Sequence, residues 1–90
     1  DRKLVAPADY PADLQPLAAA SRVRIPVLLI VGERDDRTPP SMSRRVLARL
    51  RGPKELWVAR GAKHGGPEGP EGRYYDEFFT RLARFFQRNL

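Results

Sequence analysis

Cysteine is absent from the 90-residue chain. This absence excludes a disulfide framework, a thiolate metal site and a cysteine nucleophile. It fits the cytoplasm and the periplasm alike, so the compartment stays open, and the cytoplasm is our expectation.

Long hydrophobic runs are absent as well. The longest uninterrupted apolar run, residues 27–31, is far shorter than the roughly 20 residues needed to cross a bilayer. The chain also begins at Asp1 rather than at a methionine and has no basic-then-apolar leader. We therefore expect no membrane span, and a chain that was either processed or cut from something longer.

Negative charge is scarce, because 17 Lys and Arg residues outnumber 11 Asp and Glu residues and give a net charge of +6. Such a balance raises nucleic acid as a partner. The arginines include two clusters, which are Arg44, Arg45, Arg49 and Arg51, and Arg81, Arg84 and Arg88. The first cluster has no interleaved aromatics on which bases could stack, and the phenylalanines near the second recur at helical spacing, as in a core. Nucleic acid is therefore an alternative rather than the expected partner.

The hydrophobic pattern predicts two strands, each followed by a loop. The apolar run at residues 25–31 predicts the first strand, with Pro26 near its start, where a missing amide donor is tolerated. Residues 55–59 predict the second strand. We expect loops at residues 32–38 and 60–72, and the second of these is rich in glycine and proline.

A helix is predicted between the two strands. Thr38 is its expected N-cap, and Pro39 and Pro40 would occupy the first turn, where their missing amide donors would be unpaired anyway. Gly52 and Pro53 supply the stop. The expected apolar stripe, packed on the sheet, consists of Met42, Val46, Leu47 and Leu50.

The two ends of the chain differ in character. Residues 73–89 predict a long last helix, whose apolar face comprises Tyr74, Phe78, Leu82, Phe85 and Phe86. Residues 1–23 are rich in proline and alanine and predict a loop with a short helix near residues 14–20.

The predicted order strand, helix, strand, helix indicates an α/β fold with parallel strands joined by a right-handed crossover. The continuous apolar character of residues 25–31 indicates burial on both faces of a sheet. Two strands alone cannot provide that burial, and both would have unpaired edges. We therefore expect residues 24–90 to be the C-terminal part of a larger α/β domain that is incomplete here.

Polar residues follow both predicted strands. Asp35 lies in the loop after the first strand, and His64, the only histidine, lies in the loop after the second. Neighbouring parallel strands place their carboxyl ends side by side, so the two side chains could meet. A carboxylate beside an imidazole fixes the tautomer and stabilises the imidazolium that forms on proton uptake.

The stretch PVLLIVGERDDRTPP, followed by ELWVARGAKHGG, resembles the C-terminal part of α/β-hydrolase superfamily proteins. In that superfamily a strand often leads into G-x-x-D-x-x-x-P, and the next strand leads into a G-x-x-H-like turn. Gly32, Asp35 and Pro39 match the first pattern, and Gly61 and His64 match the second. The resemblance implies an esterase-like serine hydrolase that cleaves carboxylic esters or related acyl bonds, with Asp35 as triad acid and His64 as general base.

The resemblance begins near residue 24. Residues 1–23 match only loosely, and we expect them to be the end of a cap segment. The superfamily's nucleophile motif G-x-S-x-G and its oxyanion hole are missing. Ser21, Ser41 and Ser43 lack the flanking glycines. We therefore expect this chain to be inactive alone, and the full-length protein to act on a small-molecule acyl substrate without a cofactor.

Two adjacent carboxylates compete for the role of triad acid. Asp35 stands at the matching distance from Gly32, whereas Asp36 would face solvent or cap the turn, because successive residues of an extended loop point apart. Glu33 and Arg34 are expected to be solvated loop residues. Taken singly, Asp35 could be an ordinary turn aspartate that bonds its own backbone, and His64 an ordinary exposed histidine.

Other classes of function stay open. The chain could be a non-catalytic α/β module in which Asp35 and His64 are only structural, or a small basic nucleic-acid-binding protein. A metal site fits worst, because one histidine and two adjacent aspartates form no recognised ligand spacing. The sequence does not determine the oligomeric state.

Overall fold

The computed structural model describes residues 19–89 and contains one parallel sheet of two strands, β1 and β2. The strands are β1 (Val27–Gly32) and β2 (Lys54–Ala59), and helix α2 (Pro40–Arg49) joins them. After β2 come the 3₁₀ helix η3 (Gly66–Glu68), the short helix α3 (Pro70–Arg73) and the long helix α4 (Tyr75–Asn89). The predicted α/β order of strand, helix, strand and helix is confirmed.

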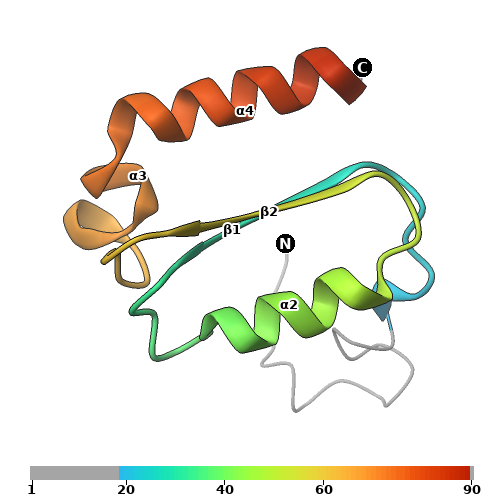
Figure 1. The fold of residues 1–90 in the computed structure, drawn as a ribbon, viewed down its shortest axis with the longest axis horizontal. Helices are drawn as coiled ribbons and strands as arrows, with labels where there is room; N and C mark the ends of the chain where they lie inside the picture. The colour runs from blue at the N-terminus through green and yellow to red at the C-terminus, as the bar shows by residue number, and fades with distance from the viewer. Residues whose placement is uncertain (1–18, 90) are drawn as a thin grey trace, which may run out of the picture.

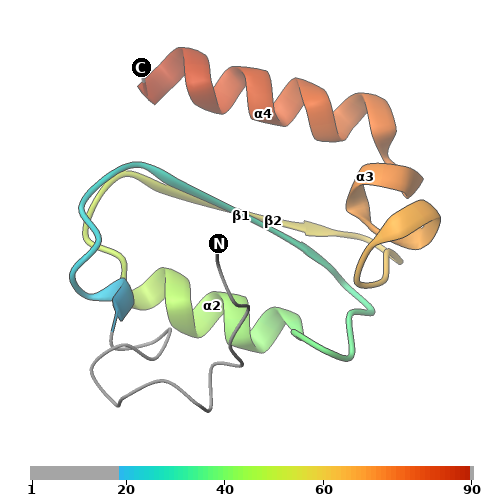
Figure 2. The same ribbon diagram turned by 180° about the vertical axis from the view of Figure 1, so that it is seen from behind.

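The sheet lies between two helical layers. Helix α4 covers one face and α2 the other, as both views show (Figures 1 and 2). The strands pair in register from Val27 with Lys54 to Gly32 with Ala59. Because they are parallel and end together, the loops that follow them leave the same edge of the sheet.

The core between the sheet and α4 is small. Trp57, Ala59 and Ala62 are buried in it, and Ile30, Tyr74 and Phe78 pack against them. Trp57 and Tyr74 meet edge to face, with ring centroids 5.8 Å apart. This packing fixes the start of α4 beside the end of β2.

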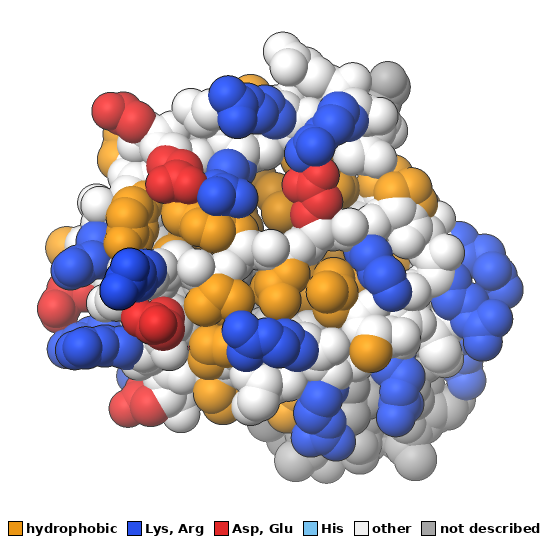
Figure 3. Space-filling view, in the orientation of Figure 1, with side chains coloured by type: hydrophobic (Ala, Val, Ile, Leu, Met, Phe, Trp, Pro, Cys, Tyr) orange, Lys and Arg blue, Asp and Glu red, His pale blue; other side chains and the backbone are white. Residues whose placement is uncertain are grey.

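Much apolar surface is left uncovered. No residue of α2 is buried, and its expected packing stripe is only partly covered, since Met42 is 40% exposed. The other exposed large hydrophobic residues are Ile25, Tyr75, Phe79 and Phe86. Hydrophobic side chains also lie at the surface in the region between α4 and α2 (Figure 3). Among residues 19–89, β1 has a single neighbouring strand, so its other edge is unpaired.

Several predicted boundaries are wrong in detail. The N-cap of α2 is Pro39 rather than Thr38, and the Thr38 hydroxyl donates to the Asp35 carboxylate instead. The predicted glycine-rich loop contains η3 and α3. The last helix begins at Tyr75, since Tyr74 leaves the helical conformation with φ −126° and ψ 52°.

Part of the predicted N-terminal segment can be checked. The short helix expected near residues 14–20 lies mostly outside the described residues, although residues 19 and 20 are helical. Within residues 19–89, no helix is both long and apolar enough to cross a bilayer.

Candidate active site

The loop after β1 holds the Asp35 carboxylate in a fixed position. The Asp35 amide donates to the Gly32 carbonyl at 3.1 Å, which turns the chain back at the strand end. Oδ1 of Asp35 then accepts from the amides of Arg37 at 2.9 Å and Thr38 at 2.8 Å. Asp35 is 4% exposed and is the buried charged residue of the described chain. Asp35 is thus a turn aspartate that accepts hydrogen bonds from its own loop, as the alternative interpretation of its sequence position predicts.

The second carboxylate oxygen of Asp35 faces the histidine. Nδ1 of His64 lies 2.8 Å from Oδ2, although the two residues are 29 positions apart. The His64 side chain is 48% exposed, and within residues 19–89 no group bonds its Nε2. This geometry favours a proton on Nδ1, donated to Oδ2, which leaves Nε2 as a proton acceptor. The structure brings the two expected site residues together, and their catalytic role stays a prediction.

Thr38 is a third member of this cluster that the sequence analysis missed. Its hydroxyl donates to Oδ2 of Asp35 at 2.9 Å and lies 3.5 Å from Nδ1 of His64. A hydroxyl residue three positions after an aspartate, at the end of a strand, was the available signal. The sequence pattern instead predicts Thr38 to be the helix N-cap, a role that the structure gives to Pro39.

The two loops are bonded to each other next to the pair. The Glu33 amide donates to the Ala59 carbonyl at 2.9 Å, and the Arg34 amide donates to the Ala62 carbonyl at 2.8 Å. Oε1 of Glu33 accepts from the Gly61 amide at 2.8 Å. Glu33 is exposed, as expected of a solvated loop residue. Its carboxylate nevertheless joins the two loops, a contact that the sequence analysis did not predict.

Burial raises the pKa of Asp35, but its hydrogen bonds lower it by more. The largest of these opposing contributions comes from the Thr38 amide, followed by the His64 ring, the Thr38 hydroxyl and the Arg37 amide. The net result lowers the pKa of Asp35 from 3.8 to about 2. Asp35 is therefore ionised throughout the range in which a histidine titrates.

Because the pKa of Asp35 is lowered, the free energy of unfolding should depend on pH in acid. A group whose pKa is lower in the folded state stabilises that state fully above its unfolded value of 3.8, and the effect is lost as pH falls toward 2. We expect a contribution of about 2 kcal/mol from Asp35. Urea unfolding of the full-length protein, with and without Asp35→Asn, should show a difference at pH 6 that is mostly lost at pH 2. An equal difference at both pH values would contradict it.

The neighbouring charged residues play no comparable role. Asp36 is exposed, and neither it nor Arg37 has an ion pair within the described part of the chain. Neither Ser41 nor Ser43, both in α2, bonds His64. Among residues 19–89, no three His, Cys, Asp or Glu side chains gather closely enough to hold a metal ion.

His64 lines two surface hollows of different character. One is charged and is lined by Asp36, Arg37, Lys63, His64, Gly65 and Glu68. The other is more apolar and is lined by Leu28, Ile30, His64, Pro70, Glu71 and Phe78. The exposed part of the histidine ring is therefore accessible from the face of β1 as well as from the loop side.

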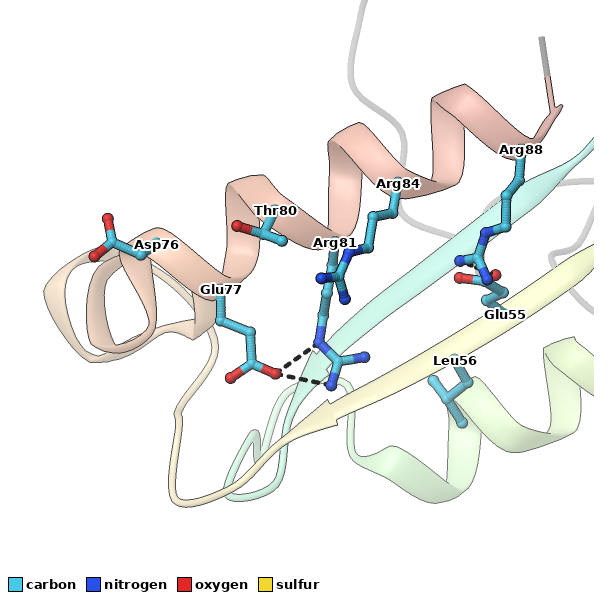
Figure 4. A pocket seen from close by; sticks show the side chains of 8 residues that line it. All are labelled: Glu55, Leu56, Asp76, Glu77, Thr80, Arg81, Arg84 and Arg88. Atoms are coloured by element: carbon cyan, nitrogen blue, oxygen red, sulfur yellow. Dashed lines mark hydrogen bonds and ion pairs between the residues drawn. The ribbon is translucent and has the colours of Figure 1, made fainter.

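A larger hollow lies between α4 and β2, away from His64 (Figure 4). Arg81 donates from Nε and Nη2 to Glu77 at 2.8 Å each, and its guanidinium lies 4.6 Å from the Trp57 ring centroid. Arg88 pairs with Glu55 of β2. These contacts tie α4 to β2, so we assign this hollow a structural role.

Comparisons with known proteins give limited further information. No family model and no solved structure matches the chain. The chain is 36% identical over 52 residues to "Uncharacterized protein YqkD" of Bacillus subtilis (strain 168). The match covers 58% of this chain and 17% of the length of that protein. The similarity is therefore partial, and it assigns neither a family nor an activity.

Proposed function

We propose that this chain is the C-terminal part of a serine hydrolase of the α/β-hydrolase type, which contributes the acid and the histidine of a Ser-His-Asp triad. The observation that supports the proposal best is the 2.8 Å contact between Nδ1 of His64 and the buried Asp35 carboxylate. The contact lies just beyond the carboxyl ends of two adjacent parallel strands, where open α/β sheets place their sites. A single turn aspartate or a single exposed histidine would support no such proposal.

The proposed mechanism assigns each atom a role. Nε2 of His64 accepts the proton of a serine hydroxyl supplied by another part of the full-length protein, as the serine oxygen attacks the acyl carbon. The imidazolium that forms keeps its Nδ1 proton bonded to Oδ2 of Asp35, which stabilises the positive charge. His64 then gives the proton to the departing alkoxide, and an activated water releases the acyl group by the same steps.

The same proposal includes the domain organisation. Residues 24–90 would be the C-terminal part of a larger domain, and residues 1–23 the end of a cap segment. The unpaired edge of β1 and the exposure of Ile25 support a longer sheet, since a continuous apolar run is typical of an interior strand that is covered on both faces. The match to 17% of the length of another protein supports only the part of this proposal that makes the full-length protein longer than this chain.

The substrate class follows from the chemistry of the pair. A Ser-His-Asp triad acts on carboxylic esters and related acyl bonds, so we propose a small-molecule acyl substrate. The hollows beside His64 are open, and the acyl pocket would be completed by upstream parts of the full-length protein.

An active-site probe tests the proposal. The full-length protein should hydrolyse p-nitrophenyl acetate and should be labelled at one serine by a fluorophosphonate, because that reagent needs a serine activated by a histidine. His64→Gln should abolish both. Residues 1–90 alone should do neither, since their sequence lacks the G-x-S-x-G motif that carries the nucleophile.

A negative result would be equally informative. If the folded full-length protein shows neither labelling nor turnover with a range of esters, thioesters and amides, the triad proposal fails. Asp35 and His64 would then be a structural pair in a non-catalytic α/β module.

A further inference from the structure

We propose that Glu33 is a positioning residue. Its carboxylate holds the loop after β2, which carries His64 (the histidine loop), against the loop after β1, which carries Asp35 (the acid loop), and so keeps His64 in line with Asp35. This inference rests on the proposed function for its effect on turnover. Its geometric part, the orientation of the histidine ring, can be measured without any substrate.

The structural basis is the turn that follows β2. The chain reverses there through a bond from the Ala62 amide to the Ala59 carbonyl at 3.1 Å. Gly61 lies inside this turn with φ +73°, a left-handed conformation that favours glycine. Its amide points out of the turn, where Oε1 of Glu33 accepts it at 2.8 Å.

Glu33 bonds this turn with its backbone as well. Its amide donates to the Ala59 carbonyl at 2.9 Å, so Glu33 makes two hydrogen bonds to the turn, one to Ala59 and one to Gly61. The Glu33 backbone alone would fix the strand end, whereas the side chain reaches the residue three positions before His64. A hydrogen bond from an amide to a carboxylate is stronger than one to a neutral acceptor.

The segment beyond the turn is held from its other side. The Lys63 amide donates to the Glu68 carbonyl at 2.7 Å, which fixes the backbone directly before His64. The histidine backbone is therefore held between the Glu33 contact and the η3 segment. The Glu33 carboxylate is the contact in this set that depends on a side chain of the acid loop, so it can be removed without changing the backbone.

The test compares three variants of the full-length protein. Glu33→Ala removes the acceptor, Glu33→Gln keeps a side-chain oxygen in the same place, and Arg34→Ala is the matched control. Arg34 is the exposed neighbour whose side chain has no ion pair within residues 19–89. We expect Glu33→Ala to lower kcat about tenfold with KM unchanged, and Glu33→Gln and Arg34→Ala to stay within about threefold of the parent.

A spectroscopic measurement separates positioning from general destabilisation. With ¹⁵N-labelled histidine, the signals missing from His64→Gln identify His64 in the spectrum. The parent protein, Glu33→Gln and Arg34→Ala should show the tautomer protonated on Nδ1, and Glu33→Ala should show a mixture of tautomers because the ring is less well fixed on Asp35.

Each outcome decides the proposal. If Glu33→Ala retains both the parental kcat and the Nδ1-protonated tautomer, the proposal is overturned, even if its unfolding midpoint falls. Glu33→Gln behaving like Glu33→Ala would also overturn it, since the bond to Gly61 would then not be the cause. If no variant and not even the parent turns over esters, the proposed function fails, while a tautomer change confined to Glu33→Ala still supports the positioning role.

Discussion

Asp35→Asn in the full-length protein should lower kcat/KM for ester hydrolysis by about 10⁴-fold, the scale that loss of a triad carboxylate produces. The asparagine oxygen can keep the bonds that Oδ1 now accepts from the Arg37 and Thr38 amides. Its amide nitrogen would then replace Oδ2 and present a donor to Nδ1 of His64. That arrangement favours the tautomer with the proton on Nε2, which cannot accept the serine proton.

The neighbouring carboxylate provides the control for this prediction. Asp36 is exposed and is the next residue in the chain after Asp35. Asp36→Asn therefore removes an equal charge from the same loop and leaves the Asp35 and His64 side chains unchanged. We expect Asp36→Asn to keep kcat/KM within about threefold of the parent. A near-normal rate for Asp35→Asn, or an equal loss in both variants, would show that Asp35 is not the triad acid.

The meeting of Asp35 and His64 was predictable because it follows from topology. Two adjacent parallel strands end at one edge of the sheet, and the loops that follow them bring their side chains to that edge. The apolar run and the glycine after it were sufficient to locate the first of these ends.

The contacts that orient the pair were not predictable from the same signals. The roles of Thr38 and Glu33 depend on the dihedral angles of two irregular loops and on the distance between them. Propensity rules placed Thr38 at a helix cap, because a threonine before two prolines is a good cap when considered locally. The Thr38 hydroxyl donates to the Asp35 carboxylate instead, since a buried charge needs more donors than its own loop amides supply.

The burial of α2 was overpredicted for a different reason. Its stripe has helical periodicity, but periodicity indicates which face of a helix is apolar and not how much surface is available to cover it. With two strands in the sheet, Met42 stays 40% exposed. The sequence pattern of α2 therefore fits a wider sheet than the described residues contain.

Gly32→Ala should be strongly destabilising and should disturb the site directly. A Cβ at this position would lie 2.2 Å from the Lys63 carbonyl oxygen and 2.4 Å from that of Ala62. Both contacts are with backbone atoms, so no side chain can rotate away and the two loops must separate. That movement stretches the bond from the Arg34 amide to Ala62 and shifts the backbone next to His64. We expect a loss of about 2 to 3 kcal/mol in the free energy of unfolding, together with loss of the Nδ1-protonated tautomer of His64.

Gly65→Ala is the matched control, because it adds the same methyl group on the other side of the histidine. Its Cβ would meet nothing closer than an oxygen of the Glu71 side chain at 3.6 Å, and its φ of −168° is an extended conformation that alanine adopts. We expect Gly65→Ala to change the free energy of unfolding by less than about 0.5 kcal/mol. Urea unfolding of both variants measures the contrast. Equal stabilities would mean that the loops are not held together at Gly32, and that the pair is positioned by the Asp35 turn alone.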